Sequence, residues 1–335
     1  MDFNDTPEEA AYRQKVRTWL EANAPRTRDA NDDGEGGGDL AAAKAWQAKK
    51  AAAGFACITW PKEWGGQGGT PIQSVIFGEE EARYPIPSNP FQIGLGMCVP
   101  TVMNFADQAT KDRFGPPAIR GEEIWCQLFS EPSGGSDVAA ARTRAEKAPD
   151  GSGDWIINGQ KVWTTGAQFS DFGIVIVRTD PNLPKHKGLT MFWVDMKDPG
   201  VEGRPIHQMS GGSGFNEVFF TDVRVKDSQR LGGVGDGWKV SLVTLMNERL
   251  AVGGATGAGW SPVPRGGPRH HRRRRRAPAP GERGAGEAGR LVRPGRRPAP
   301  RPEPDHDRPL QGPDPGPGKL HRQDRLGHPH AGPGQ

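Results

Sequence analysis

The stretch Gln127-Leu-Phe-Ser-Glu-Pro-Ser-Gly-Gly-Ser-Asp137 decides the fold of this chain. A strand-like segment ends at Ser130, and a turn rich in Gly and Ser follows it directly. Such a turn exposes backbone N–H groups and hydroxyls, so it can hold a phosphate or the polar edge of a ring without steric conflict. From the spacing alone, an ordinary surface turn is the simpler interpretation.

A second stretch, Lys161-Val-Trp-Thr-Thr165, follows at a short distance along the chain. Trp163 offers a flat apolar face for an aromatic ring, and the two Thr residues supply hydroxyl and backbone donors. The alternative is that Trp163 belongs to the core. Just upstream, Asn158-Gly159 stands between two apolar runs, which predicts a β-hairpin turn at these two residues.

Helical and strand-like patterns occupy separate parts of the chain. Thr6 and Glu9 have the spacing of a capping box at the start of a first helix. Strand-like segments follow Trp125, and a helical period returns from Asp236. This order predicts an α+β multidomain fold. Further helices are predicted over 41–53, 71–84 and 96–114. In the last helix, one stripe at helical spacing contains Trp238, Leu242, Leu245, Met246, Arg249 and Leu250.

The composition changes after Trp260. Residues 261–335 contain no Ile, Phe, Trp, Tyr, Met, Cys, Asn or Thr, and 45 of these 75 positions are Arg, Pro or Gly. Too few apolar side chains remain to offset the entropy of ordering such a segment. We therefore predict a disordered tail over 260–335 and expect any catalytic function to reside before it.

The net charge of +4 combines two opposite parts. The tail carries 16 Arg and one Lys against seven acidic residues, so the rest of the chain has a net charge of −6. The pI of about 9.0 is thus a property of the tail. It gives no evidence for a nucleic-acid-binding body.

The cysteines and the N-terminus indicate a soluble cytoplasmic protein. Cys57, Cys98 and Cys126 are odd in number and lack metal-ligand spacing, which suits buried thiols in a reducing compartment and no metal site. The polar N-terminus is not a signal peptide, and no apolar run is long enough to span a membrane. We expect no membrane partner.

Several strings of this sequence, in this order, resemble the acyl-CoA dehydrogenase family. They are Q-x-x-S-E-P-x-x-G-S-D, W-T-T after N-G-x-K, F-x-D-V-x-V from Phe220 to Val225, the WPKEWGG loop and the GDGW helix start. The resemblance covers the chain up to Gly259. It implies an N-terminal α-helical domain over 1–122, a middle β-barrel domain over 123–230, and the first helix of a truncated C-terminal helical bundle over 231–259.

The resemblance also implies a reaction and its partners. Members of the family bind FAD and remove hydrogen from the α and β carbons of an acyl-CoA thioester. A base takes the α-proton, and the β-hydrogen leaves as hydride to the flavin. The electrons pass to an electron-transfer flavoprotein or a similar acceptor, and the proteins are commonly homo-oligomers.

The family's flavin-binding residues map onto both stretches. By resemblance, Gln127, Phe129 and Ser130 line the flavin ring, and the ring packs against Trp163, Thr164 and Thr165. Gly135 and Ser136 would meet the FAD phosphates or the CoA arm, and Ser136 matches a serine that touches the acyl-CoA.

The base candidate lies in the last helix. In one branch of the family, the catalytic Glu precedes an Arg in the first bundle helix, and Asn247-Glu248-Arg249-Leu250 matches that pattern. Glu248 is therefore the candidate base, and Arg249 is the candidate contact to CoA. The alternative is a solvated Glu-Arg pair on a helix face.

The tail admits two interpretations. Its Arg, Pro, Gly and Ala content is typical of GC-rich DNA read out of frame, so we hypothesise a frameshift just after Gly259 and expect impaired activity of this chain. In that case the chain is an impaired dehydrogenase or an inactive flavin-binding remnant. The rival is a basic tail that binds nucleic acid, which we do not favour because it lacks aromatic residues for base stacking.

Overall fold

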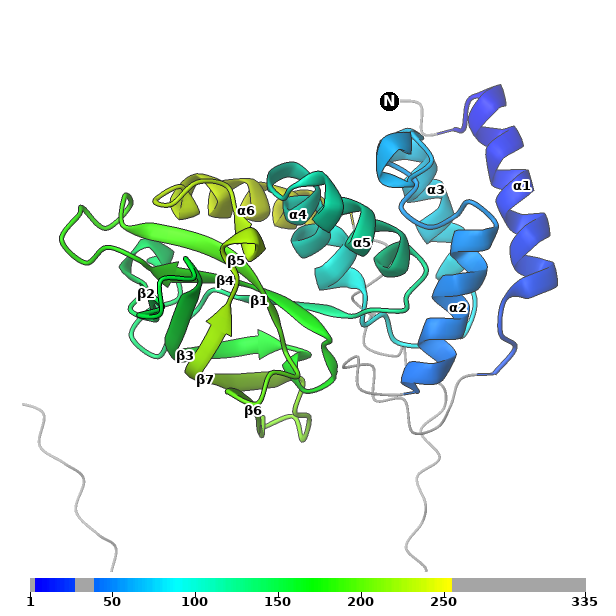
Figure 1. Ribbon diagram of the computed structural model, residues 1–335. Coiled ribbons are helices and arrows are strands. Elements are labelled where there is room, and N and C mark those ends of the chain that lie inside the picture. Colours follow the sequence, from blue (N-terminus) through cyan, green and yellow to red (C-terminus); the bar gives the residue numbers. More distant parts are fainter. Residues whose placement is uncertain (1–3, 28–38, 255–335) are drawn as a thin grey trace, which may run out of the picture. The chain divides into compact units, whose positions relative to one another are not determined.

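The computed structural model describes residues 4–27 and 39–254, and it describes side chains up to Arg249. The predicted tail over 260–335 and the last five residues of the predicted bundle segment, 255–259, lie outside the described residues. Figure 1 shows the described elements: helices α1 to α3, then α4 and α5, then a β-sheet, then helix α6.

Three helices form the first part of the chain: α1 (Pro7–Asn23), α2 (Leu40–Ala52) and α3 (Pro71–Glu81). The capping box predicted for α1 is confirmed, since Thr6 accepts from the backbone of Glu9 and the Glu9 side chain accepts from the backbone of Thr6. These helices enclose a core of their own that includes Val16, Leu20, Trp46, Phe55 and Phe77.

The prediction of one helix over 96–114 was wrong. A π-helical turn (Gly94–Cys98) leads into α4 (Val99–Phe105), and α5 (Gln108–Ile119) is a separate helix. The chain is extended at Ala106, and the side chain of Asp107 accepts the N–H of Thr110 at 2.8 Å. Asp107 thus caps a new helix where the apolar period alone suggested continuity.

Eight strands form one sheet. Their order is β6-β7-β3-β2-β4-β5-β8, and β1 also pairs with β4. This order does not return to its first strand, so the predicted barrel is an open sheet within the described residues. The strands are β1 (Trp125–Leu128), β2 (Arg144–Lys147), β3 (Trp155–Thr165), β4 (Phe172–Arg178), β5 (Leu189–Asp195), β6 (Val201–Ile206), β7 (Phe215–Val225) and β8 (Arg230–Leu231).

The hairpin turn predicted at Asn158-Gly159 was also wrong. Both residues lie inside β3, which pairs with β7 along most of its length. The register shifts between Ile157 and Gly159, and Gly159 has a φ of +149°. A Cβ at Gly159 would lie 2.7 Å from the Cα of Thr143. Glycine therefore serves a β-bulge and a close backbone approach here, not a turn.

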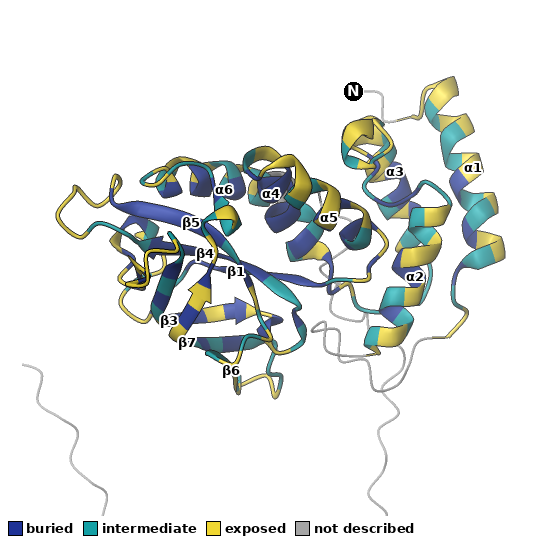
Figure 2. Cartoon of the chain, in the orientation of Figure 1, coloured by how far each residue is buried: buried dark blue, intermediate teal, exposed yellow. Residues whose placement is uncertain are grey.

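Strand β4 is apolar on both faces because both faces are covered. Ile174 and Ile176 pack in the cluster that includes residues of α4, α5 and α6, whereas Val175 and Val177 pack in the cluster shared with β3 and β7. Figure 2 shows the resulting band of buried residues along β4 and β5. A continuous apolar run is the expected pattern for such a strand.

Helix α6 (Gly237–Gly254) packs through small residues. Val240, Ser241 and Thr244 are fully buried, and the hydroxyls of Thr244 and Thr101 lie 2.9 Å apart. Of the predicted stripe, Leu242 is 44% exposed and Met246 is 55% exposed. Trp238 and Leu245 are partly buried and pack against the core. The predicted stripe therefore coincides only in part with the face that α6 buries.

Candidate active site

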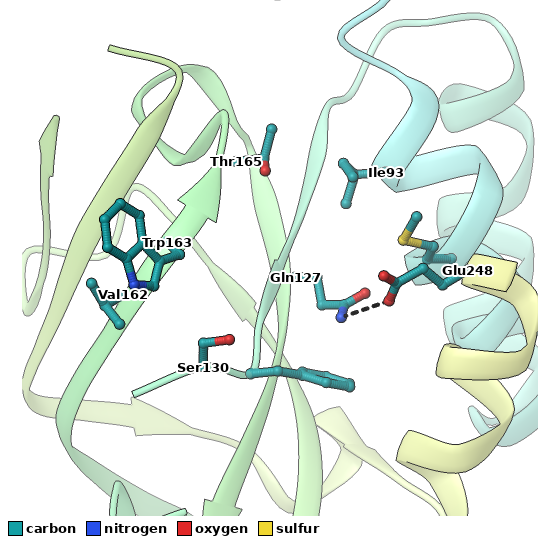
Figure 3. A pocket seen from close by; sticks show the side chains of 9 residues that line it. Ile93, Gln127, Ser130, Val162, Trp163, Thr165 and Glu248 are labelled. Carbon is teal, nitrogen blue, oxygen red and sulfur yellow. Dashed lines mark hydrogen bonds between the residues drawn. The ribbon is translucent and has the colours of Figure 1, made fainter. Parts of the chain in front are cut away.

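A cavity of about 170 Å³ lies between β1, β3, the segment that leads into α4, and α6 (Figure 3). Six of the nine lining residues belong to the set predicted from the sequence. The lining consists of Ile93, Met97, Gln127, Phe129, Ser130, Val162, Trp163, Thr165 and Glu248.

The end of β1 supplies one wall. Gln127 and Ser130 are partly buried, and Phe129 is buried. The backbone carbonyl of Ser130 accepts the N–H of Val162 at 2.9 Å, which joins this wall to β3. The wall is thus fixed by main-chain pairing, and the polar side chains of Gln127 on β1 and Ser130 just after it line the cavity.

A bulge in β3 presents Trp163 to the cavity. The register against β7 shifts between Lys161 and Thr164, and Trp163 has a φ of +59°, a left-handed conformation that is uncommon for a bulky residue. Its side chain is 58% exposed and meets the ring of Phe215 edge-on. Strained backbone of this kind often marks a functional site.

Helix α6 brings Glu248 to the opposite side. Glu248 is partly buried, and the amide nitrogen Nε2 of Gln127 donates a long hydrogen bond of 3.5 Å to its Oε2 atom (Figure 3). The two residues are 121 positions apart in the sequence. Among the described residues, the Glu248 carboxylate accepts this one hydrogen bond, which leaves acceptor capacity for another group.

The polar atoms at this site fit a planar polar ligand. Gln127 lines the cavity, and within the described residues its Oε1 is buried without a hydrogen-bond partner. Buried polar atoms are nearly always paired in folded proteins. Together with the exposed face of Trp163 and the hydroxyls of Ser130 and Thr165, this atom fits a ring system with hydrogen-bonding groups on its edge, such as a flavin.

Four predicted residues do not line the cavity. Gly135 and Ser136 lie exposed on the turn that follows Ser130, and a Cβ at Gly135 would be 3.5 Å from the Oγ of Ser130. Arg249 is exposed on α6. Thr164 also faces away from the cavity, because it is buried while its neighbours on β3 are exposed.

Three lining residues were not predicted. Ile93 and Met97 come from the segment that leads into α4, and Val162 comes from β3. No motif surrounds Ile93 or Met97, so only the packing of this segment against β1 brings them to the site. Val162 could have been found, because it lies between two residues already singled out.

A buried ion pair lies directly behind the cavity wall. The Nζ of Lys161 is 2.8 Å from Oε1 of Glu131, and both side chains are at most 5% exposed. Burial is the largest influence on Lys161 and lowers its pKa to about 8, although Glu131 raises it. Burial also raises the pKa of Glu131, but Lys161 and the backbone N–H groups of Thr143 and Arg142 outweigh burial and hold it below its ordinary value.

The cysteines carry no chemistry at this site. Cys57, Cys98 and Cys126 are unpaired, and burial raises the pKa of Cys57 and of Cys126 to about 12. Their thiols thus stay protonated and unreactive near neutral pH.

The part of the chain that the structure describes holds no group of three potential metal ligands. It also contains no helix of the length and apolarity that crossing a membrane requires.

Sequence comparisons identify the family. The family description "Acyl-CoA dehydrogenase, N-terminal domain" matches residues 6–122, and "Acyl-CoA dehydrogenase, middle domain" matches residues 126–223. The chain therefore belongs to the acyl-CoA dehydrogenase family and carries these two domains.

Named relatives and solved structures agree with this assignment. The chain is 42% identical over 200 residues to Acyl-CoA dehydrogenase FadE34 of Mycobacterium tuberculosis, an alignment that covers 60% of this chain and 27% of that protein. It is 40% identical over 242 residues to Acyl-CoA dehydrogenase IpdE1 of the same organism, covering 71% and 62% of the two chains. The structure of the Tcur3481-Tcur3483 steroid ACAD matches with a TM-score of 0.66 and 27% identity, covering 77% of this chain and 65% of that chain. The chain thus spans less than two thirds of the length of these relatives.

Proposed function

We propose that this protein catalyses the α,β-dehydrogenation of an acyl-CoA thioester with FAD as cofactor. The observation that carries the proposal is the position of Glu248, which faces Gln127 across a cavity lined by Ser130 and Trp163. A partly buried carboxylate thus lies opposite polar and aromatic groups suited to a flavin.

The residues of β1 and β3 would hold the cofactor. Gln127, Phe129 and Ser130 would border the flavin ring on one side, and Trp163 and Thr165 would border it on the other. Gly135 and Ser136, on the exposed turn, would meet phosphates of FAD or the CoA arm. A bound flavin would supply the acceptor for the β-hydrogen of the substrate and its two electrons.

Glu248 would take the α-proton. Its carboxylate keeps acceptor capacity beyond the bond from Gln127, so one oxygen is available to a proton on the substrate. The Gln127 amide would orient the carboxylate as a hydrogen-bond donor. Arg249, the next residue on α6, would contact the CoA arm.

The proposed partners follow from the family. They are an acyl-CoA substrate, an electron-transfer flavoprotein or similar acceptor, and further copies of the chain in a homo-oligomer. One solved neighbour is named a steroid ACAD. A substrate panel should therefore include a steroid acyl-CoA beside short, long and branched acyl groups.

Flavin loading and turnover test the proposal on the full chain. The purified protein is titrated with FAD, and the absorbance spectrum of the bound flavin is recorded. Turnover of the acyl-CoA panel is then followed by reduction of an electron-accepting dye. We expect a bound flavin and slow dye reduction with at least one member of the panel, because we expect the activity of this chain to be impaired.

Two variants assign the base. Glu248→Gln should lower kcat by at least about 100-fold, because general-base catalysis contributes 10²–10⁴-fold. Glu21→Gln, at an exposed glutamate on α1, is the matched control and should leave kcat unchanged.

A chain that binds flavin without turnover would support the inactive flavin-binding alternative. A chain without flavin that binds nucleic acid would support the basic-tail alternative.

A further inference from the structure

The loop that carries Ser130 is anchored from behind by one buried lysine. The Nζ of Lys161 donates to the backbone carbonyl of Phe129 at 3.2 Å and to the carboxylate of Glu131 at 2.8 Å. Phe129 and Glu131 are the two neighbours of Ser130 in the chain. A single ammonium group thus holds the backbone on both sides of the residue that lines the cavity.

Glu131 extends this anchor to a second segment. Its Oε2 accepts the N–H of Arg142 at 2.7 Å, and its Oε1 accepts the N–H of Thr143 at 2.9 Å. The backbone of Glu131 also exchanges two hydrogen bonds with Gly134, at 3.1 and 2.9 Å, which closes the Gly-rich turn. The carboxylate therefore fixes where that turn begins.

Lys161 also lies next to the other wall. Val162, its neighbour, donates to the carbonyl of Ser130, and the bulge that exposes Trp163 begins at Lys161. The side chain of Lys161 is fully buried, whereas Trp163 is 58% exposed. Strand β3 thus directs the side chain of Lys161 into the core and the ring of Trp163, two residues later, outward.

We propose that Lys161 and Glu131 are positioning residues that hold Ser130 and Trp163 at a fixed separation for the flavin ring. This inference rests on the proposed function in so far as it concerns flavin. Neither side chain lines the cavity, so the pair acts through the backbone of Phe129 to Glu131 and of Lys161 to Trp163. A buried ion pair that only stabilised the fold would be replaceable by a neutral pair without consequence for the ligand.

A neutral pair separates positioning from stability. The double variant Lys161→Met with Glu131→Gln removes both charges and keeps the approximate volume, so no unpaired charge is left in the core. The single variant Lys161→Met is included to show the cost of an unpaired carboxylate. Lys197→Met is the matched control, because Lys197 pairs with Asp171 on the surface and is 72% exposed.

Two measurements are made on each full-length variant. Amide hydrogen exchange of residues 129–136 is followed without flavin, and the dissociation constant and absorbance spectrum are measured with FAD. We expect the double variant to remain folded, to exchange about tenfold faster in 129–136, and to bind FAD about tenfold more weakly. Lys197→Met should match the unaltered chain in both measurements.

The outcomes distinguish this inference from the proposed function. A folded double variant with unchanged exchange in 129–136 and unchanged FAD affinity would overturn the positioning role. If the unaltered chain binds no FAD, the proposed function fails, and the exchange measurement still decides whether the pair holds this loop. Faster exchange confined to 129–136 supports the inference, and faster exchange across the whole chain contradicts it.

Discussion

Two carboxylates near the cavity are held in opposite ways. Glu131 is buried and receives an ammonium group and two backbone N–H groups at 2.7–2.9 Å. Glu248 is partly buried and receives one amide N–H at 3.5 Å. A carboxylate whose oxygens already accept several hydrogen bonds is suited to hold structure. A carboxylate that accepts only one long hydrogen bond is suited to accept a proton.

The difference follows from the elements that carry them. Glu131 lies where the end of β1 meets β3, so main-chain groups surround it. Glu248 lies on α6, whose own N–H groups are used within the helix and whose outer side chains, such as Leu242 and Met246, are exposed. The sheet side of the cavity is thus fixed by main-chain hydrogen bonds, while α6 contributes the carboxylate of Glu248 to the lining.

The largest expected effect comes from breaking the buried pair. Glu131→Gln leaves the ammonium of Lys161 in the core without its counter-charge, which costs about 3–5 kcal/mol of unfolding free energy. Glu248→Gln should change the unfolding free energy by less than about 0.5 kcal/mol. Urea unfolding followed by circular dichroism measures both, and equal losses would contradict the comparison.

The next effect concerns the bulge in β3. Gly159→Ala should cost about 1–3 kcal/mol, because the new Cβ would lie 2.7 Å from the Cα of Thr143 at a φ of +149°. Gly203→Ala is the matched control, since a Cβ there meets no atom within 4 Å. Thermal unfolding compares the two variants. Similar melting temperatures would show that the sheet side is not rigidly fixed at Gly159.

The pH dependence of stability sharpens the assignment of Glu131. Its folded pKa lies below the ordinary 4.5, so the unfolded state binds more protons as pH falls, and the stability from Glu131 is lost below pH 4.5. We compare urea unfolding of the unaltered chain and the Lys161→Met, Glu131→Gln double variant from pH 6 to pH 3. Their difference should change mainly below pH 4.5. A difference that does not vary with pH would argue against a paired Glu131.

The smallest effect is expected on the outer face of α6. Leu242→Gln should change the unfolding free energy by less than about 0.5 kcal/mol, because the side chain is 44% exposed. Urea unfolding of this variant checks that the outer face adds little to the stability of the chain. A loss above 1 kcal/mol, on the order of a buried contact, would show that this face is packed.

The sequence predicted the sheet side of the site better than the fold around it. The motifs at Gln127–Ser130 and Trp163–Thr165 identify two strand ends because polar and aromatic residues interrupt apolar runs there. The same reasoning failed at Gly159, since a positive φ serves a turn or a bulge equally well and only the neighbouring strand decides. The prediction of a closed barrel was wrong for a related reason, because the order in which strands pair depends on contacts between residues distant in sequence.

The helix side was predicted only in part. The Asn-Glu-Arg-Leu string singled out Glu248, which lines the cavity, but the fully buried side chains of α6 are Val240, Ser241 and Thr244. Two of these residues are polar, so hydrophobic periodicity could not reveal them. Ile93 and Met97 reach the cavity through tertiary packing alone.

The most direct test of the account follows a single turnover. The Glu248→Gln chain is loaded with FAD, mixed without oxygen with an acyl-CoA that the unaltered chain oxidises, and the loss of flavin absorbance is recorded over time. If Glu248 is the base, the variant should show a normal flavin spectrum and bleaching slowed by at least about 100-fold. Bleaching at the rate of the unaltered chain would contradict it.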